Sequence, residues 1–191
     1  MIDIEIATRR VVTDLDELGV GHALVGGLAV SARTEPRFTK DLDLAMSVDD
    51  DAGAESAVDE LTRRGYAIRA TIEHDSGKLA TVRLVTPDVA FAADLLFSSS
   101  GIEREIVVDA EAAQAFPGVW VPVARTGHLI AVKVLARDDD RRPQDFVDLR
   151  ALLRVADDGE LERARGAIAL ITERGYARGR DLPAALDELL A

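Results

Sequence analysis

Apolar and polar residues along the first two thirds of the chain follow patterns typical of short strands between helices. Apolar residues at helical spacing predict a helix over residues 4–18 and another over residues 51–64, each followed or closed by a glycine. The segment "HALVGG" is typical of a strand that runs into a glycine turn, and "LAVSAR" begins a helix directly after it. A strand is therefore expected to lead through Gly26 and Gly27 into a helix.

Alternating or continuous apolar residues predict the remaining strands. These strands are expected at "DLDLAMSV", "YAIRATIE", "LATVRLV", "VAFAADLLF", "REIVV" and "VWVPV". From residue 126 onward the pattern is helical, with helices expected at "TGHLIAVKVLARD", "PQDFVDLRALLRVA", residues 158–174 and "LPAALDELLA". We expect an α+β fold with a mixed sheet flanked by helices in residues 1–123. Residues 124–191 are expected to form a C-terminal helical bundle packed on that core.

The composition limits the kinds of site and the location that the chain can have. Its 191 residues include no cysteine and three scattered histidines, so any metal is expected to be a hard cation held by oxygen. No uncharged apolar run approaches the ~20 residues that a membrane helix needs. The N-terminus lacks the order of a signal peptide. A cytoplasmic location without membrane contact is therefore predicted.

The net charge of −12 argues against binding nucleic acid through a generally basic surface. Basic residues are nevertheless clustered, with one group in the opening stretch and another near residue 140. The first consists of Arg33, Arg37 and Lys40, and the second of Arg137, Arg141 and Arg142. A local basic pocket can therefore exist on an acidic protein.

The glycine pair is the first candidate for binding chemistry. Glycines between a strand and a helix let the backbone approach a ligand closely, and the exposed N–H groups at the helix start suit a phosphate. The alternative is an ordinary turn, for which glycine pairs are common. The pair by itself leaves both interpretations open.

Acidic residues inside the predicted strands carry a stronger signal. Asp41 and Asp43 are two residues apart, so on a strand their carboxylates point to the same face. Like charges this close are costly unless a cation neutralises them, which Mg²⁺ does in phosphoryl and nucleotidyl transfer. Asp94 lies in a nearly continuous apolar segment and completes a metal triad if its strand adjoins that of Asp41. The alternatives are an acidic edge strand and, for Asp94, a residue that caps a turn.

Two later helices add charged candidates. Lys133 sits in a helix that is apolar around most of its circumference, which directs its ammonium group to a particular place. Asp145 and Asp148 are three residues apart and share a helical face. Asp145 follows Pro143, where an acid favours the start of a helix, so Asp148 is the better functional candidate.

The order of these motifs resembles the nucleotidyltransferase superfamily of DNA polymerase β type. The shared features are Gly-Gly, thirteen residues, Asp-Leu-Asp, a later strand Asp, and then a helical Lys and "QDFVDL". The segment "KVLAR" followed by "RRPQDFVDL" resembles more narrowly the AbiEii-type toxins, including the MenT toxins. The resemblance covers about residues 22–153.

The resemblance implies a role for each matching position. Gly26, Gly27, Ser31 and Lys133 would bind the nucleotide, with Arg33 as a further phosphate contact, and Asp41, Asp43 and Asp94 would hold Mg²⁺. Asp41, Asp43, Lys133 and Asp148 would form the catalytic set, with Asp145 as the alternative to Asp148. Thr39 is either the start of a strand or a site of regulatory phosphorylation, since a dianion there would repel the nucleotide.

The predicted function is therefore a Mg²⁺-dependent nucleotidyltransferase toxin with a cognate antitoxin. It would transfer NMP from an NTP, with CTP as one candidate, to the 3′ end of tRNA and so block translation. One alternative is an antibiotic nucleotidyltransferase of the lincosamide or aminoglycoside kind, since an acidic chain suits a cationic drug. Another is a catalytically silent relative that only binds nucleotides.

Overall fold

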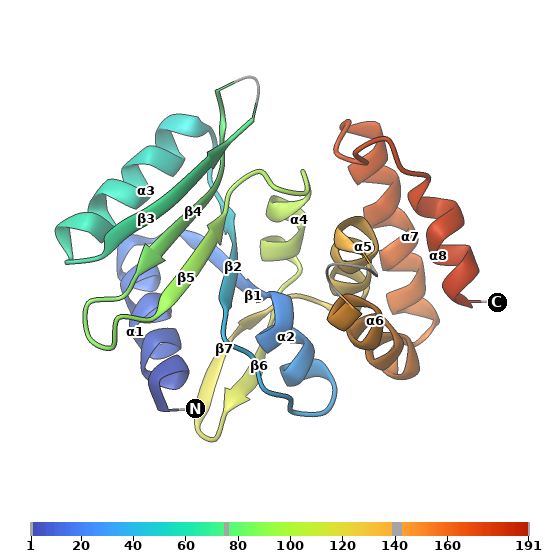
Figure 1. The fold of residues 1–191 in the computed structure, drawn as a ribbon, viewed down its shortest axis with the longest axis horizontal. Helices are drawn as coiled ribbons and strands as arrows, with labels where there is room; N and C mark the ends of the chain where they lie inside the picture. Colours follow the sequence, from blue (N-terminus) through green and yellow to red (C-terminus); the bar gives the residue numbers. More distant parts are fainter. Residues whose placement is uncertain (1, 75–76, 139–142, 191) are drawn as a thin grey trace.

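A computed structural model describes residues 2–74, 77–138 and 143–190. Within these ranges the chain forms a seven-stranded mixed sheet with helices around it (Figure 1). The strand order is β3-β4-β5-β2-β1-β7-β6. The strands are β1 (Gly21–Val25), β2 (Leu42–Ser47), β3 (Ala67–Glu73), β4 (Leu79–Val85), β5 (Ala92–Leu96), β6 (Glu111–Phe116) and β7 (Val119–Val123).

Helices α1 to α4 alternate with strands along the chain, and helices α5 to α8 are consecutive in the sequence after the last strand. Helices α5 to α8 gather on one side of the sheet, shown in orange to red in Figure 1. The helices are α1 (Ile2–Leu18), α2 (Gly26–Arg33), α3 (Asp51–Arg63), α4 (Glu103–Val108), α5 (Thr126–Ala136), α6 (Pro143–Val155), α7 (Asp158–Glu173) and α8 (Leu182–Leu190). The α+β fold with a C-terminal group of helices is thus confirmed.

The strand predicted at "REIVV" is wrong, because these residues form helix α4. The carboxylate of Glu103 accepts hydrogen bonds from the backbone N–H groups of Ser99 and Ser100, at 2.8 and 2.7 Å. Ile102 and Ile106 are both buried, four residues apart on one helical face. The Glu103 bonds to the preceding loop and this buried face outweigh the preference of β-branched residues for strands.

Strand β6 was not predicted. It forms a hairpin with β7 at the edge of the sheet, and its residues are exposed or half-buried. An edge strand with little apolar alternation gives a weak sequence signal, although Pro117 and Gly118 mark the turn of the hairpin.

The C-terminal helices pack on one another and on the core. Helix α5 packs on α7 at Gly127, where a Cβ atom would lie 2.3 Å from the carbonyl oxygen of Glu160. The Glu160 carboxylate also accepts a hydrogen bond of 2.6 Å from the N–H of Gly127. Helix α2 of the core contacts both α5 and α6. The boundary at residues 123 and 124 falls between β7 and α5, and its meaning as a domain boundary stays a prediction. No helix in the described ranges is long and apolar enough to cross a membrane.

Candidate active site

The acidic residues gather on one face of the two central strands. Asp43 and Ala45 of β2 alternate onto the same face, and Asp94 and Leu96 of β5 do the same beside them. Strands β2 and β5 are parallel neighbours, and Asp43 and Asp94 are direct partners in their register. These four residues, with Asp41 just before β2, line a cleft of about 660 Å³. The structure therefore places all three predicted metal ligands along the same cleft.

The two glycines lie against this cleft at the end of β1. Gly26 has φ +65°, and a Cβ atom there would lie 1.9 Å from Oδ2 of Asp43. At Gly27 a Cβ atom would lie 2.6 Å from Nη2 of Arg37 and 3.0 Å from Oγ1 of Thr39. A side chain at either position would therefore displace charged or polar groups of the cleft. Gly26 is required for this arrangement, because its φ is positive and a Cβ atom there would meet Asp43 from Oδ2 to Cβ.

On the opposite wall a cluster of charges joins three elements. Lys133 of α5 places its ammonium nitrogen 2.5 Å from Asp145 and 2.8 Å from Asp148, both on α6. The guanidinium of Arg37, on the segment before β2, lies 2.7 Å from Asp148. Asp148 also accepts a hydrogen bond of 3.1 Å from Gln144. Lys133 thus contacts both Asp148, the catalytic candidate, and Asp145, its alternative.

The protonation of Asp148 reflects these contacts. Burial by itself raises the pKa of Asp148, whose side chain is only 1% exposed. Hydrogen bonds from Lys133, Arg37 and Gln144 act in the opposite direction and together lower the pKa below its ordinary value. Asp148 is therefore a carboxylate at neutral pH. Asp148 holds the guanidinium of Arg37 and the ammonium of Lys133 at the wall of the cleft.

Asp94 is engaged by an arginine. Arg83 of β4 forms a two-point ion pair with it, with Nε to Oδ1 at 2.7 Å and Nη2 to Oδ2 at 2.6 Å. The hydrogen bond with Asp94 is the main cause that raises the pKa of Arg83, and the charges of Asp41 and Asp43 raise it further. Arg83 is therefore electrostatically coupled to the whole acidic group.

The site fits a Mg²⁺ ion held by two carboxylates, Asp41 and Asp43, better than one held by a triad that includes Asp94. In the described ranges no three acidic or histidine side chains are close enough together to hold a metal. Mg²⁺ is commonly bound by one or two carboxylates, with phosphate oxygens of the substrate and water completing its coordination. Two carboxylates beside a glycine turn meet that need.

Two predicted nucleotide contacts lie elsewhere. The guanidinium of Arg33 donates to the backbone carbonyls of Val123 and Ala124, at 2.8 and 2.9 Å, so it ties α2 to the end of β7. Ser31 hydrogen-bonds to the backbone of Gly27 and Arg37. Neither side chain lines the cleft. Their roles in this structure are to hold α2 and the following segment in place.

Other residues of the site escaped the sequence analysis. Arg37 was noted only as part of a basic group, and its ion pair with Asp148 spans 111 positions of the chain. Arg83 alternates with apolar residues on β4, and a hairpin register of β4 with β5 would have placed it opposite Asp94. Arg178, beyond α7, also lines the cleft, and its guanidinium donates to the carbonyl of Ser99. Arg141 and Arg142 lie outside the described residues.

Comparison with known families shows to which family the chain belongs. The sequence model of the family described as "Nucleotidyl transferase AbiEii toxin, Type IV TA system" matches residues 10–190. The chain belongs to the AbiEii family. This AbiEii protein is therefore a nucleotidyltransferase of a toxin–antitoxin family. No curated protein sequence matches it.

Solved structures of nucleotidyltransferases share the fold of this AbiEii protein. An antigenic nucleotidyltransferase-like protein from Paracoccidioides brasiliensis is 17% identical, with 98% of this chain and 93% of that chain covered and a TM-score of 0.56. The complex of ANT(2″)-Ia with adenylyl-2″-tobramycin is 14% identical, with 88% and 97% covered and a TM-score of 0.57. The lincosamide antibiotic adenylyltransferase LnuA is 15% identical, with 78% and 96% covered and a TM-score of 0.50. At these identities the likeness shows the fold alone.

The charge cluster generates a prediction about pH. Because the pKa of Asp148 is lower in the folded than in the unfolded protein, its stabilising effect is present above the unfolded value of about 4. It is lost as pH falls through the folded value. Asp148→Asn should lower the free energy of unfolding at neutral pH by about 2 kcal/mol, since Arg37 loses its carboxylate partner and Lys133 loses one of two. Urea denaturation at about pH 7 and about pH 3 measures the effect. The free energy of unfolding of Asp148→Asn should fall less between these two pH values than that of wild type.

The matched control is Asp59→Asn, which changes an exposed aspartate on α3 that forms no ion pair in the part of the chain described. This control should follow the wild-type pH dependence. An Asp148→Asn protein with wild-type stability and an unchanged pH dependence would contradict the role of the cluster.

Proposed function

We propose that this enzyme transfers NMP from an NTP to the 3′ end of tRNA and thereby acts as the toxin of a toxin–antitoxin pair. The single observation that carries the proposal is the convergence of three groups on one cleft: the glycine turn, the Asp41 and Asp43 pair, and the ammonium of Lys133. Such a set can hold a triphosphate and align its α-phosphate for attack by a hydroxyl. The family description also implies an antitoxin partner.

Each group has a role that follows from its position. The N–H groups at the start of α2 would bind the triphosphate at the glycine turn. An ammonium has three donors, and Lys133 uses two on Asp145 and Asp148, which leaves one for a phosphate oxygen. Asp41 and Asp43 would hold Mg²⁺, which when bound neutralises charge on the phosphates. Asp148 would keep Lys133 and Arg37 oriented. Of the possible donors, CTP stays a prediction.

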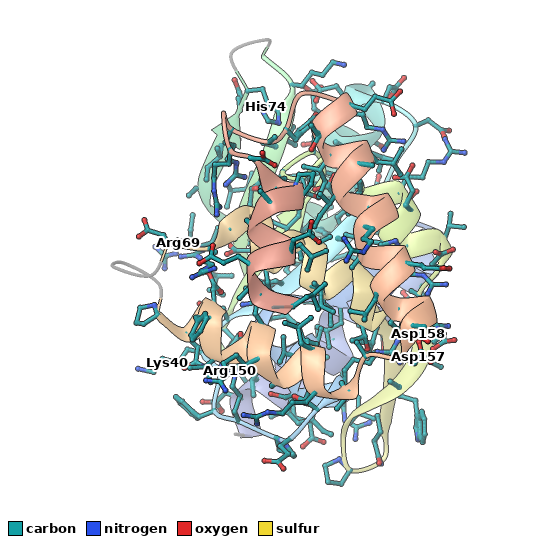
Figure 2. All side chains as sticks on the ribbon, turned by 90° about the vertical axis from the view of Figure 1, so that its right-hand side faces the viewer. Lys40, Arg69, His74, Arg150, Asp157 and Asp158 are labelled. Carbon is teal, nitrogen blue, oxygen red and sulfur yellow. The ribbon has the colours of Figure 1, made fainter. Side chains whose placement is uncertain are left out.

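An exposed aromatic ring supports RNA as the acceptor. Phe38 lines the cleft, is 70% exposed and has the Lys40 ammonium 5.9 Å from its ring centre. Its segment is held by the bonds of Arg37 to Asp148 and to the Phe38 carbonyl. An exposed ring next to a cation is a surface on which an unpaired base can stack. Figure 2 shows that Lys40, beside this ring, lies on the same side of the face as Arg150, and that the acidic Asp157 and Asp158 lie on the other side.

Thr39 fits the proposal as a point of control. Its hydroxyl lies beside the glycine turn, in hydrogen-bond contact with the backbone of Asp41. A phosphate attached there would add about two negative charges where the triphosphate is expected to bind. Phosphorylation of Thr39, by the antitoxin or through it, would therefore switch the enzyme off.

The proposal is tested by incubating the purified protein with Mg²⁺, each labelled NTP in turn and total tRNA. Label is expected on tRNA with one NTP, and Asp41→Asn is expected to reduce the rate by at least about 100-fold because one metal carboxylate is removed. Asp59→Asn is the control for a surface carboxylate. Absence of label on RNA, with NTP binding intact, would contradict the tRNA acceptor.

The stacking surface gives a second prediction. Phe38→Ala should raise the KM for RNA by about tenfold or more and leave the Kd for NTP unchanged, because a stacked base contributes about 1–3 kcal/mol. Trp120→Ala is a matched control, since Trp120 is also exposed, at 65%, but lies on β7 away from the cleft. Steady-state kinetics with labelled NTP measure both. An unchanged KM for RNA in the Phe38 variant would remove this support.

The second candidate function is transfer of NMP to a cationic antibiotic. It is favoured by the net charge of −12 and by the shared fold with ANT(2″)-Ia and LnuA. The same assay with tobramycin or lincomycin in place of tRNA separates the two. Label on the drug and none on RNA would establish this alternative.

A further inference from the structure

We propose that Arg83 replaces a metal ion at Asp94, so that the cation of this enzyme is bound by Asp41 and Asp43 alone. Arg83 is then a positioning residue that keeps the third carboxylate away from the metal. The inference rests on the proposed metal-dependent function for the presence of a cation beside Asp43. It goes beyond that function in assigning which carboxylates bind the cation.

The geometry of the ion pair is the first argument. Both carboxylate oxygens of Asp94 accept short hydrogen bonds from Arg83, at 2.7 and 2.6 Å. A planar guanidinium and a carboxylate that meet at two points form a strong and directional pair. A metal that used Asp94 would first have to displace the arginine from at least one oxygen.

The sheet fixes this pair in place. Arg83 and Asp94 are direct partners in the antiparallel register of β4 and β5, and Asp94 and Asp43 are direct partners in the parallel register of β5 and β2. Arg83, Asp94 and Asp43 thus form one row across three adjacent strands. Residues directly opposite on neighbouring strands stay within contact distance, so the arrangement does not depend on a flexible loop.

The charges give the same assignment. Two carboxylates side by side on neighbouring strands repel each other, and a cation must offset this repulsion. Arg83 supplies that positive charge permanently, because a guanidinium is not deprotonated in proteins. With Asp94 neutralised in this way, the remaining acids, Asp41 and Asp43, suffice for one divalent cation that also binds phosphate oxygens.

A cycle of variants tests the inference by direct measurement of metal binding. The probe is Mn²⁺, titrated into the full-length protein and followed by electron paramagnetic resonance of the free ion. Asp94→Asn should weaken Mn²⁺ binding by no more than about fivefold, because it removes no ligand and leaves the positive charge of Arg83 unpaired beside Asp43. Arg83→Gln should bind Mn²⁺ about fivefold more tightly or better, because it releases the Asp94 carboxylate. The double variant, which has the wild-type net charge, should return to the wild-type affinity.

Arg69→Gln is the matched control for loss of a positive charge. Arg69 lies on the neighbouring strand β3, is exposed, and makes no ion pair within the described ranges. It should leave Mn²⁺ affinity close to wild type. If Arg69→Gln and Arg83→Gln tighten binding equally, the effect is general electrostatics and the inference is overturned.

Two further outcomes would overturn it in different ways. Weakening of Mn²⁺ binding by tenfold or more in the double variant, by about 1.4 kcal/mol, would show that Asp94 is a metal ligand and that the metal displaces Arg83, because this variant lacks Asp94 at the wild-type net charge. A wild-type protein that binds no Mn²⁺, with or without NTP, would remove the metal from the proposed function as well. The first outcome leaves the proposed function intact, so the two failures are distinguishable.

Discussion

In the cleft, the carboxylate of Asp43 occupies the space that a side chain at residue 26 would need, and the rest of the site depends on this close approach. It requires a residue without Cβ that tolerates a positive φ, and it requires β1 and β2 to be antiparallel neighbours so that Val25 and Asp43 are register partners. The Asp43 carboxylate, which we propose binds the metal, is thereby held beside the first N–H groups of α2. The proposed cation and phosphate sites are therefore adjacent.

The opposite wall depends on the buried charges around Asp148. This one carboxylate joins Lys133 of α5 to Arg37, and Arg37 in turn packs against Gly27 and donates to the carbonyl of Phe38. The helical part therefore sets the position of the segment that precedes the metal carboxylates. Breaking such a buried pair leaves charges without a partner and is costly. The same contacts that bind the helical part to the sheet also orient the cations of the cleft.

The sequence predicted most elements and the main acidic residues, but the partners of those residues could not be predicted from it. Periodicity identified β2 and β5, and the spacing of Asp41 and Asp43 placed both on one face. The pairing of Asp94 with Arg83 depends on the register of β4 with β5, and that of Arg37 with Asp148 on contacts across 111 positions. Such contacts arise from tertiary packing, which local patterns do not encode.

The most direct test of this account is nucleotide binding by Gly26→Ala, compared with Gly19→Ala. The two glycines have nearly the same φ, +65° and +67°, but a Cβ atom at residue 19 meets nothing within 4 Å. Both variants carry the same backbone strain of about 1–2 kcal/mol, so a difference between them isolates the contact with Asp43. Calorimetric titration with NTP and Mg²⁺ should show wild-type binding in Gly19→Ala and loss of binding in a folded Gly26→Ala protein. Equal binding by both variants would contradict the account.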